Sequence, residues 1–217
     1  PTMLGFILLS TPLAATAQQF GDFSYSSDGL AITITGYFGP GGVVTIPDTI
    51  AGLPVTRIGD YAFYQRPSLS SVTIPGSVTS IGDDALRNCT NLNSVTIPGS
   101  VTNMGYAAFY SCTSLTNVTI SNGVTSIGVT AFYSCTSLAS VTLGSTVVNI
   151  GIRAFESCTS LTSVTIPGSV TNIGASAFGS CTSLASVTIS NGVTSLGDSA
   201  FISCTNLTNV TIPGSVT

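Results

Sequence analysis

The sequence predicts a right-handed solenoid of about seven coils, made mostly of β-strands with short helical turns and closed at the N-terminus by a β-hairpin. Two observations predict this fold class. A unit of 23 residues, beginning at Val72, recurs without insertion to the end of the chain. Each unit repeats the same apolar alternation and the same turn residues, so a coil can bury its apolar face only against its neighbours. We expect parallel strands to form a ladder along one face.

The repeat array occupies most of the chain. Its regular units begin at Val72, Val95, Val118, Val141, Val164, Val187 and Val210. A looser copy, five residues longer, precedes them at residues 44–71. We therefore assign residues 44–217 to one array. Because the last unit stops inside a strand at Thr217, we expect the sequence to be a fragment of a longer protein.

The first residues have the composition of a targeting segment. Met3 to Ala15 is an apolar run, and Ala15-Thr16-Ala17 follows it as an A-x-A cleavage pattern. We interpret residues 1–17 as the remnant of a signal peptide that is cleaved before Gln18; the alternative is a short buried helix. The run is too short to span a bilayer. We expect an exported protein, bacterial in origin, that is secreted or displayed at the cell surface and not inserted in the membrane.

Residues 18–43 are predicted to cap the array. Two alternating stretches, Phe23–Ser26 and Leu30–Thr35, flank a Ser27-Asp28-Gly29 turn, which indicates a β-hairpin. A solenoid needs such a cap because its first coil would otherwise expose its core and an unpaired strand edge.

Each position of the unit has a predicted role, counted from Val72 as position 1. The apolar residues at positions 1, 3, 7 and 10 point inward, and the Pro-Gly at positions 4 and 5 predicts a type II turn. The recurrent glycine at position 11 indicates a positive φ or a close backbone approach. Positions 14 and 15, Ala-Phe in most units, predict a short helical turn. Positions 12, 13 and 16 vary between units, so we expect them to be exposed.

Composition excludes several classes of function. The chain has no histidine, so it cannot form a Ser-His-Asp or Cys-His pair or a histidine-containing metal site. Only 6% of residues are charged, and the formal net charge is -4 without a basic cluster. This balance argues against nucleic acid or an anionic membrane as partner. We expect no catalytic site and no cofactor.

The pattern V-T-I-P-x-x-V-T-x-I-G-x-x-A-F-x-x-C-x-x-L resembles the BspA-like leucine-rich repeats, a family of bacterial and some protist surface proteins. The resemblance covers residues 44–217, although Gln65-Arg66-Pro67 replaces the S-C-T segment in the first copy. It implies a secreted or cell-surface solenoid that acts in adhesion or protein binding without catalysis. The shared motif is the core, so the resemblance transfers no ligand-binding residue.

One cysteine per unit recurs at position 18: Cys89, Cys112, Cys135, Cys158, Cys181 and Cys204. Stacked coils would place neighbouring Cβ atoms about 4.8 Å apart, which is longer than a disulfide prefers. We expect a buried column of free thiols, with disulfides between neighbours as the alternative. One thiol per coil along a line does not make a tetrahedral metal site.

A column of threonines at position 2 is predicted to face outward from the strands. It comprises Thr73, Thr96, Thr119, Thr142, Thr165, Thr188 and Thr211, each preceded two residues earlier by Ser or Asn. This two-column array is similar to the flat threonine arrays of ice-binding solenoids. The alternative is an ordinary half-exposed strand face, which suits β-branched residues.

A second candidate surface lies at the variable positions. Its residues are Tyr106, Tyr110, Val129, Tyr133 and Ile152. Exposed aromatic residues beside apolar ones form a candidate contact patch, and the alternative is scattered tyrosines that cover the coil edge. We expect a monomer that binds a protein, an extracellular-matrix component or a cell-surface ligand. The rival interpretation is a structural spacer of a larger surface protein.

Overall fold

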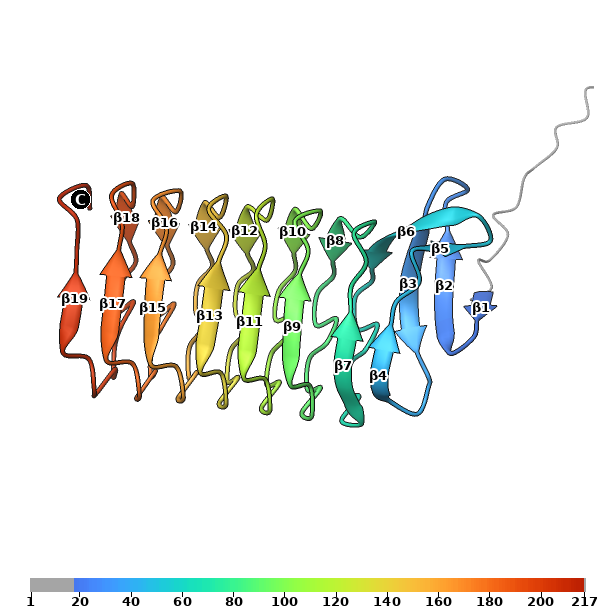
Figure 1. Ribbon diagram of the computed structural model, residues 1–217, viewed down its shortest axis with the longest axis horizontal. Coiled ribbons are helices and arrows are strands. Elements are labelled where there is room, and N and C mark those ends of the chain that lie inside the picture. Colours follow the sequence, from blue (N-terminus) through green and yellow to red (C-terminus); the bar gives the residue numbers. More distant parts are fainter. Residues whose placement is uncertain (1–17, 217) are drawn as a thin grey trace, which may run out of the picture.

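The computed structural model describes residues 18–216 of the chain. Its coils stack side by side in one row along the long axis, with the N-terminal strands at one end (Figure 1). The predicted signal peptide at residues 1–17 lies outside the described residues. Stacked coils with parallel strand ladders confirm the predicted solenoid.

One face carries what we call the front ladder, formed by positions 1 to 3 of each unit and the residues just before them. Its strands are β4 (Gly42–Thr45), β7 (Leu69–Thr73), β9 (Ser94–Ile97), β11 (Asn117–Ile120), β13 (Ser140–Leu143), β15 (Ser163–Ile166), β17 (Ser186–Ile189) and β19 (Asn209–Thr211). Paired strands are parallel and in register, so Val95 lies beside Val118 and Val118 beside Val141. The 23-residue period thus becomes columns of equivalent residues.

A back ladder of shorter strands runs along the opposite side. It contains β6 (Leu53–Ile58), β8 (Ser80–Ile81), β10 (Asn103–Met104), β12 (Ser126–Ile127), β14 (Asn149–Ile150), β16 (Asn172–Ile173) and β18 (Ser195–Leu196). Its pairs are parallel as well. Each short strand turns its second residue, at position 10, toward the core.

The predicted hairpin is present. Strands β2 (Phe23–Ser27) and β3 (Ile32–Tyr37) pair antiparallel, with β1 (Gln18–Phe20) on the outer edge. Strand β3 also pairs parallel with β6, so the hairpin continues the back ladder, and β5 (Thr49–Ile50) pairs with β6 from a separate sheet. The Phe23 and Tyr37 rings pack against Phe63 with centroids 6.4 and 5.3 Å away, which covers the first coil.

The predicted helical turn at positions 14 and 15 is wrong, because no residue in 18–216 is helical. Positions 13 and 17 have positive φ instead, for example 52° at Asp84 and 60° at Asn88. Alternate amides of this segment bond to the next coil: Asp84 donates to Tyr106 O at 2.8 Å, and Asn88 donates to Tyr110 O at 2.8 Å. The left-handed residues break the helical run, and bonding between coils replaces bonding within a helix.

The turn after the front strand differs between units. In the Pro-Gly units the Val78 amide donates to Pro75 O at 3.1 Å, which makes proline the first residue of the turn. Gly76 has no positive φ, so the predicted type II turn is wrong there. In the Ser-Asn-Gly units Gly123 is the third turn residue and has φ 111°, as a type II turn requires.

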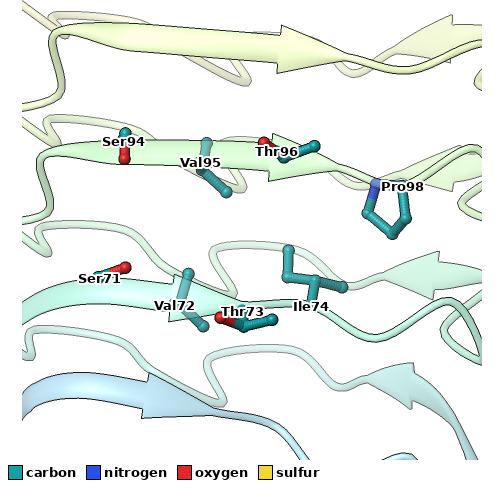
Figure 2. Close-up of a pocket in the computed structure, with 8 residues that line it drawn as sticks. All are labelled: Ser71, Val72, Thr73, Ile74, Ser94, Val95, Thr96 and Pro98. Carbon is teal, nitrogen blue, oxygen red and sulfur yellow. The ribbon is translucent and has the colours of Figure 1, made fainter.

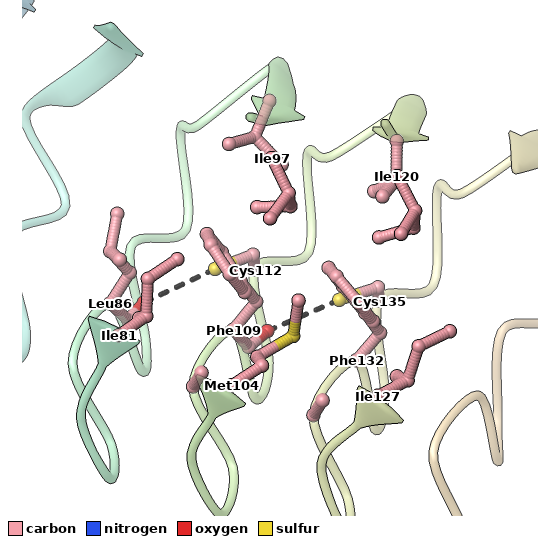
Figure 3. Close-up of a cluster of buried hydrophobic side chains, with 14 of the residues drawn as sticks. Ile81, Leu86, Ile97, Met104, Phe109, Cys112, Ile120, Ile127, Phe132 and Cys135 are labelled. Carbon is pink, nitrogen blue, oxygen red and sulfur yellow. Dashed lines mark hydrogen bonds between the residues drawn. The ribbon is translucent and has the colours of Figure 1, made fainter. Parts of the chain in front are cut away.

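The core consists of columns that run through the stack. Phenylalanine rings at position 15 stack with centroids 5.1 to 5.5 Å apart from Phe109 to Phe201. The thiol column beside them is free, and five of its six members are buried, which confirms the prediction. Each thiol donates to a carbonyl of the preceding coil, as Cys112 does to Leu86 O at 3.2 Å (Figure 3).

The recurrent glycine at position 11 allows a close backbone approach. A Cβ atom added at Gly151 would lie 2.7 Å from Gly128 O of the preceding coil, and Gly151 has no positive φ. Of the two predicted reasons for this glycine, the structure shows the close approach.

Candidate functional site

The structure brings the predicted contact residues together along one edge of the solenoid. Position 12 of successive coils forms a single exposed column, in which Tyr106 is 50% exposed, Val129 39% and Ile152 49%. The same position holds Asp60, Asp83 and Asp198 in other coils. The fold therefore accepts a charged residue there, and the core does not require these apolar side chains.

Beside it, position 16 forms a stacked column. The Tyr110 and Tyr133 rings are 4.9 Å apart and 10° from parallel, and the Arg87 guanidinium lies 4.4 Å from the Tyr110 centroid. Each ring covers a face of its neighbour, and both tyrosines are half-buried. Together the two columns make up the variable strip, defined as Tyr106, Tyr110, Val129, Tyr133 and Ile152.

Position 13 joins this surface in only some coils, so its predicted exposure is confirmed in part. Asp84, Ala107 and Thr130 are buried there, whereas Arg153 and Ser199 are exposed. The buried residues are small, and Asp84 is paired within its own turn to Arg87 at 3.1 Å. The burial of position 13 therefore differs from coil to coil.

From residue 57 onward, charge is confined to the edge that carries the strip. From residue 57 onward every charged residue lies between positions 9 and 18 of its coil: Arg57, Asp60, Arg66, Asp83, Asp84, Arg87, Arg153, Glu156 and Asp198. Three ion pairs form within single turns, Arg57–Asp60 at 3.1 Å, Arg87–Asp84 at 3.1 Å and Arg153–Glu156 at 3.3 Å. The front ladder from β7 onward has no charged side chain.

Asp84 also affects its neighbours. Its hydrogen bond raises the pKa of Arg87, and its negative charge raises the pKa of Tyr61. Both shifts stabilise the protonated forms, which these groups already hold at physiological pH. The first part of this edge is held by charge-assisted bonds, whereas the strip itself is uncharged.

The threonine column lies on the outer surface of the front ladder. Thr73, Thr96, Thr119, Thr142, Thr165 and Thr188 are all exposed. Within residues 18–216 their hydroxyls form no hydrogen bond, whereas Thr79 at position 8 donates to Thr56 O at 3.1 Å. The position-2 hydroxyls are thus available to solvent or a ligand.

This face is interrupted twice. Strands β7 and β9 are not joined in the front ladder, nor are β13 and β15. A cleft of about 360 Å³ lies at the first interruption (Figure 2), and one of about 310 Å³ lies at the second. Val141 and Leu143 are partly exposed at the second, although their counterparts Val118 and Ile120 are each 1% exposed.

A missing backbone donor accompanies both interruptions. Ser121 donates its amide to Ile97 O at 3.0 Å, but the equivalent residue is Pro98 after β9 and Pro167 after β15. Proline has no N–H to donate. Pro75 and Pro213 occupy the same position after strands that do pair. The proline therefore permits an opening without enforcing one.

The described part of the chain contains neither a cluster of His, Cys, Asp and Glu able to hold a metal nor a helix long and apolar enough to cross a bilayer. A model of the BspA-type leucine-rich repeat region, which comprises 6 copies, matches residues 56–172 and 106–217. The chain belongs to this family.

Solved leucine-rich repeat proteins share the fold. The T. pallidum leucine-rich repeat protein is 33% identical with a TM-score of 0.81, over 89% of this chain and 91% of that one. A leucine-rich repeat protein from Bacteroides capillosus is 26% identical with a TM-score of 0.50, over 58% and 96%. The pneumococcal vaccine antigen PcpA, 16% identical with a TM-score of 0.55 over 93% and 71%, shares the fold alone. No curated protein matches the chain.

In this BspA-type protein, sequence reasoning found the strip and the threonine column but missed the two clefts. The signal for the clefts was the proline at position 4. It was insufficient, because Pro75 and Pro213 carry the same signal without an interruption.

Proposed function

We propose that this BspA-type leucine-rich repeat protein is an exported, non-catalytic scaffold that binds a protein of the extracellular matrix or a cell surface through the variable strip. One observation carries the proposal. Three successive coils expose Tyr106, Val129 and Ile152 at a position where the fold accepts aspartate. A contiguous apolar row beside two tyrosines has the composition of a protein-binding surface.

Two further features support this proposal. The repeat family builds scaffolds with extended surfaces, and the residues shared by all units are used in the core. The apolar run and A-x-A pattern before Gln18 support export. The chain has no histidine, which supports a role without acid–base catalysis by that residue.

Ice binding by the threonine column has less support. A lattice match needs evenly spaced hydroxyls, and the front ladder is interrupted between β7 and β9 and between β13 and β15. A spacer role remains the rival proposal, and it differs in predicting that no face of the protein binds a partner with saturation.

The test is a saturation binding measurement on immobilised matrix and cell-surface extracts. Full-length protein is compared with the triple variant Tyr106→Ser, Val129→Ser, Ile152→Ser and with the control Thr96→Ala, Thr119→Ala, Thr165→Ala. These side chains are exposed, so each change should alter stability by no more than about 0.5 kcal/mol. We expect the unchanged protein to bind with saturation, the strip variant to bind with an affinity at least tenfold lower, and the control to bind as the unchanged protein does. Loss in the threonine variant alone would place the function on the front ladder, and no saturable binding would favour the spacer.

A further inference from the structure

We infer that the strip recognises an extended polypeptide segment that is apolar in the middle and carries Lys or Arg at both ends. This inference rests on the proposed function and specifies the partner. Its basis is the order of residues in the position-12 column, which reads Asp83, Tyr106, Val129, Ile152, Ala175 and Asp198 from coil to coil. Backbone bonds join these coils edge to edge, as in Ala107 N to Val129 O at 3.0 Å.

The two carboxylates at the ends of this row flank the strip, and no ion pair neutralises their charge. Asp83 and Asp198 are exposed, and neither forms an ion pair among residues 18–216. One oxygen of Asp83 accepts the Tyr106 amide at 2.7 Å, which leaves the other oxygen open. Arg57, Arg87 and Arg153 are each paired with an acid of their own turn. A segment that docks along the strip thus meets negative charge at both ends.

The geometry favours an extended segment. Asp83 and Asp198 are five coils apart, or about 24 Å at the ordinary strand spacing, which an extended chain spans in about seven residues. Tyr110 and Tyr133 lie beside this row at position 16, and their hydroxyls form no hydrogen bond within residues 18–216. An extended backbone has free amides and carbonyls to offer these hydroxyls, whereas a helix has used its own.

The test begins with selection of displayed random 12-residue peptides on the full-length protein. Enriched peptides are then titrated by fluorescence anisotropy against the wild type, Asp83→Asn/Asp198→Asn and the strip triple variant. The control Asp22→Asn/Asp48→Asn makes the same change in net charge at exposed acids outside the strip. We expect enriched peptides to carry Lys or Arg about seven residues apart around apolar residues. The Asp83/Asp198 variant should raise their Kd about two- to thirtyfold, whereas the control should leave it unchanged.

Other outcomes separate this inference from the proposed function. Peptides without basic residues that bind the Asp83/Asp198 variant normally but not the triple variant would overturn the charge pattern and leave the strip as the binding site. Binding that survives in the triple variant would overturn both. Failure to enrich any peptide would contradict the inference, while saturable binding to matrix extracts would still stand for the proposed function.

Discussion

Each coil holds two residues in the left-handed backbone region, at positions 13 and 17, and none of them is glycine. Such a conformation costs an L-residue about 1–2 kcal/mol. The same residues donate backbone hydrogen bonds to the next coil, as Ser157 does to Gly179 O at 2.8 Å. These bonds between coils offset the cost of the left-handed conformation. The glycine that recurs in every complete unit is at position 11, where the demand is space rather than φ.

The space at position 11 can be tested by adding one methyl group. Gly151→Ala would place its Cβ atom 2.7 Å from backbone atoms of Gly128, which cannot move without shifting a coil. We expect the free energy of unfolding to fall by about 1–3 kcal/mol, measured by urea denaturation. Gly76→Ala is the matched control, because a Cβ atom there meets nothing within 4 Å and the φ is not positive. Equal stability of the two variants would refute the close-approach explanation.

At the scale of the element, the continuity of the front ladder varies with the residue at position 4 of the unit. Units that place serine or glycine at position 4 are joined to the preceding strand, whereas two of the units with proline there are not. The second opening leaves Val141 and Leu143 partly exposed, whereas Val72 and Ile74 at the first opening stay buried. The missing donor accompanies both openings but does not produce one by itself, because Pro75 and Pro213 lack it too and their strands still pair.

Introducing proline at a paired position should weaken the ladder. Ser121→Pro removes the bond from Ser121 N to Ile97 O at 3.0 Å. We expect a loss of about 1–3 kcal/mol of unfolding free energy and faster amide exchange in β11 (Asn117–Ile120). Ser121→Ala keeps the amide and should stay within about 0.5 kcal/mol of the wild type. Unchanged exchange in the proline variant would show that the missing donor does not cause the interruptions.

In the whole molecule, the repeat sorts residues into columns with separate roles. Phenylalanine and cysteine fill the interior, hydroxyls cover the front ladder, and charge gathers beside the variable strip. The thiol column is buried, and this burial raises the pKa of Cys89 and Cys158 to about 12 and that of Cys135 well above its usual value. The folded state therefore holds protons that the unfolded chain releases in alkali.

This difference predicts alkaline instability. Because the thiol pKa is raised in the folded state, each buried thiol stabilises that state fully below about pH 9. This stabilisation is lost as pH rises toward 12, by about 1.4 kcal/mol per pH unit for each buried thiol. Urea unfolding at pH 8, 9 and 10 should show the unfolding free energy falling with pH. Cys135→Ala should reduce this slope by the contribution of one thiol. Cys204→Ala is the comparison, because Cys204 is only partly buried and its removal should change the slope less than Cys135→Ala does. An identical slope in Cys135→Ala would exclude this origin.

The sequence alone determined the period, the inward columns, the free thiols and the hairpin that precedes the array. These features depend on residue spacing and apolar character, which repeat identically from Val72 onward. The residues of the strip could also be found, because their variation between units marks positions that the core does not use.

Only the tertiary structure decided which variable positions are exposed, how positions 12 to 17 are bonded and where the front ladder opens. Asp84 is buried although its position varies, Leu86 bonds to the next coil instead of continuing a helix, and Pro98 interrupts a ladder that Pro75 leaves intact. In each case the outcome depends on competition between hydrogen bonds within a coil and those between coils. Such competition involves residues 23 positions apart and is absent from any single repeat.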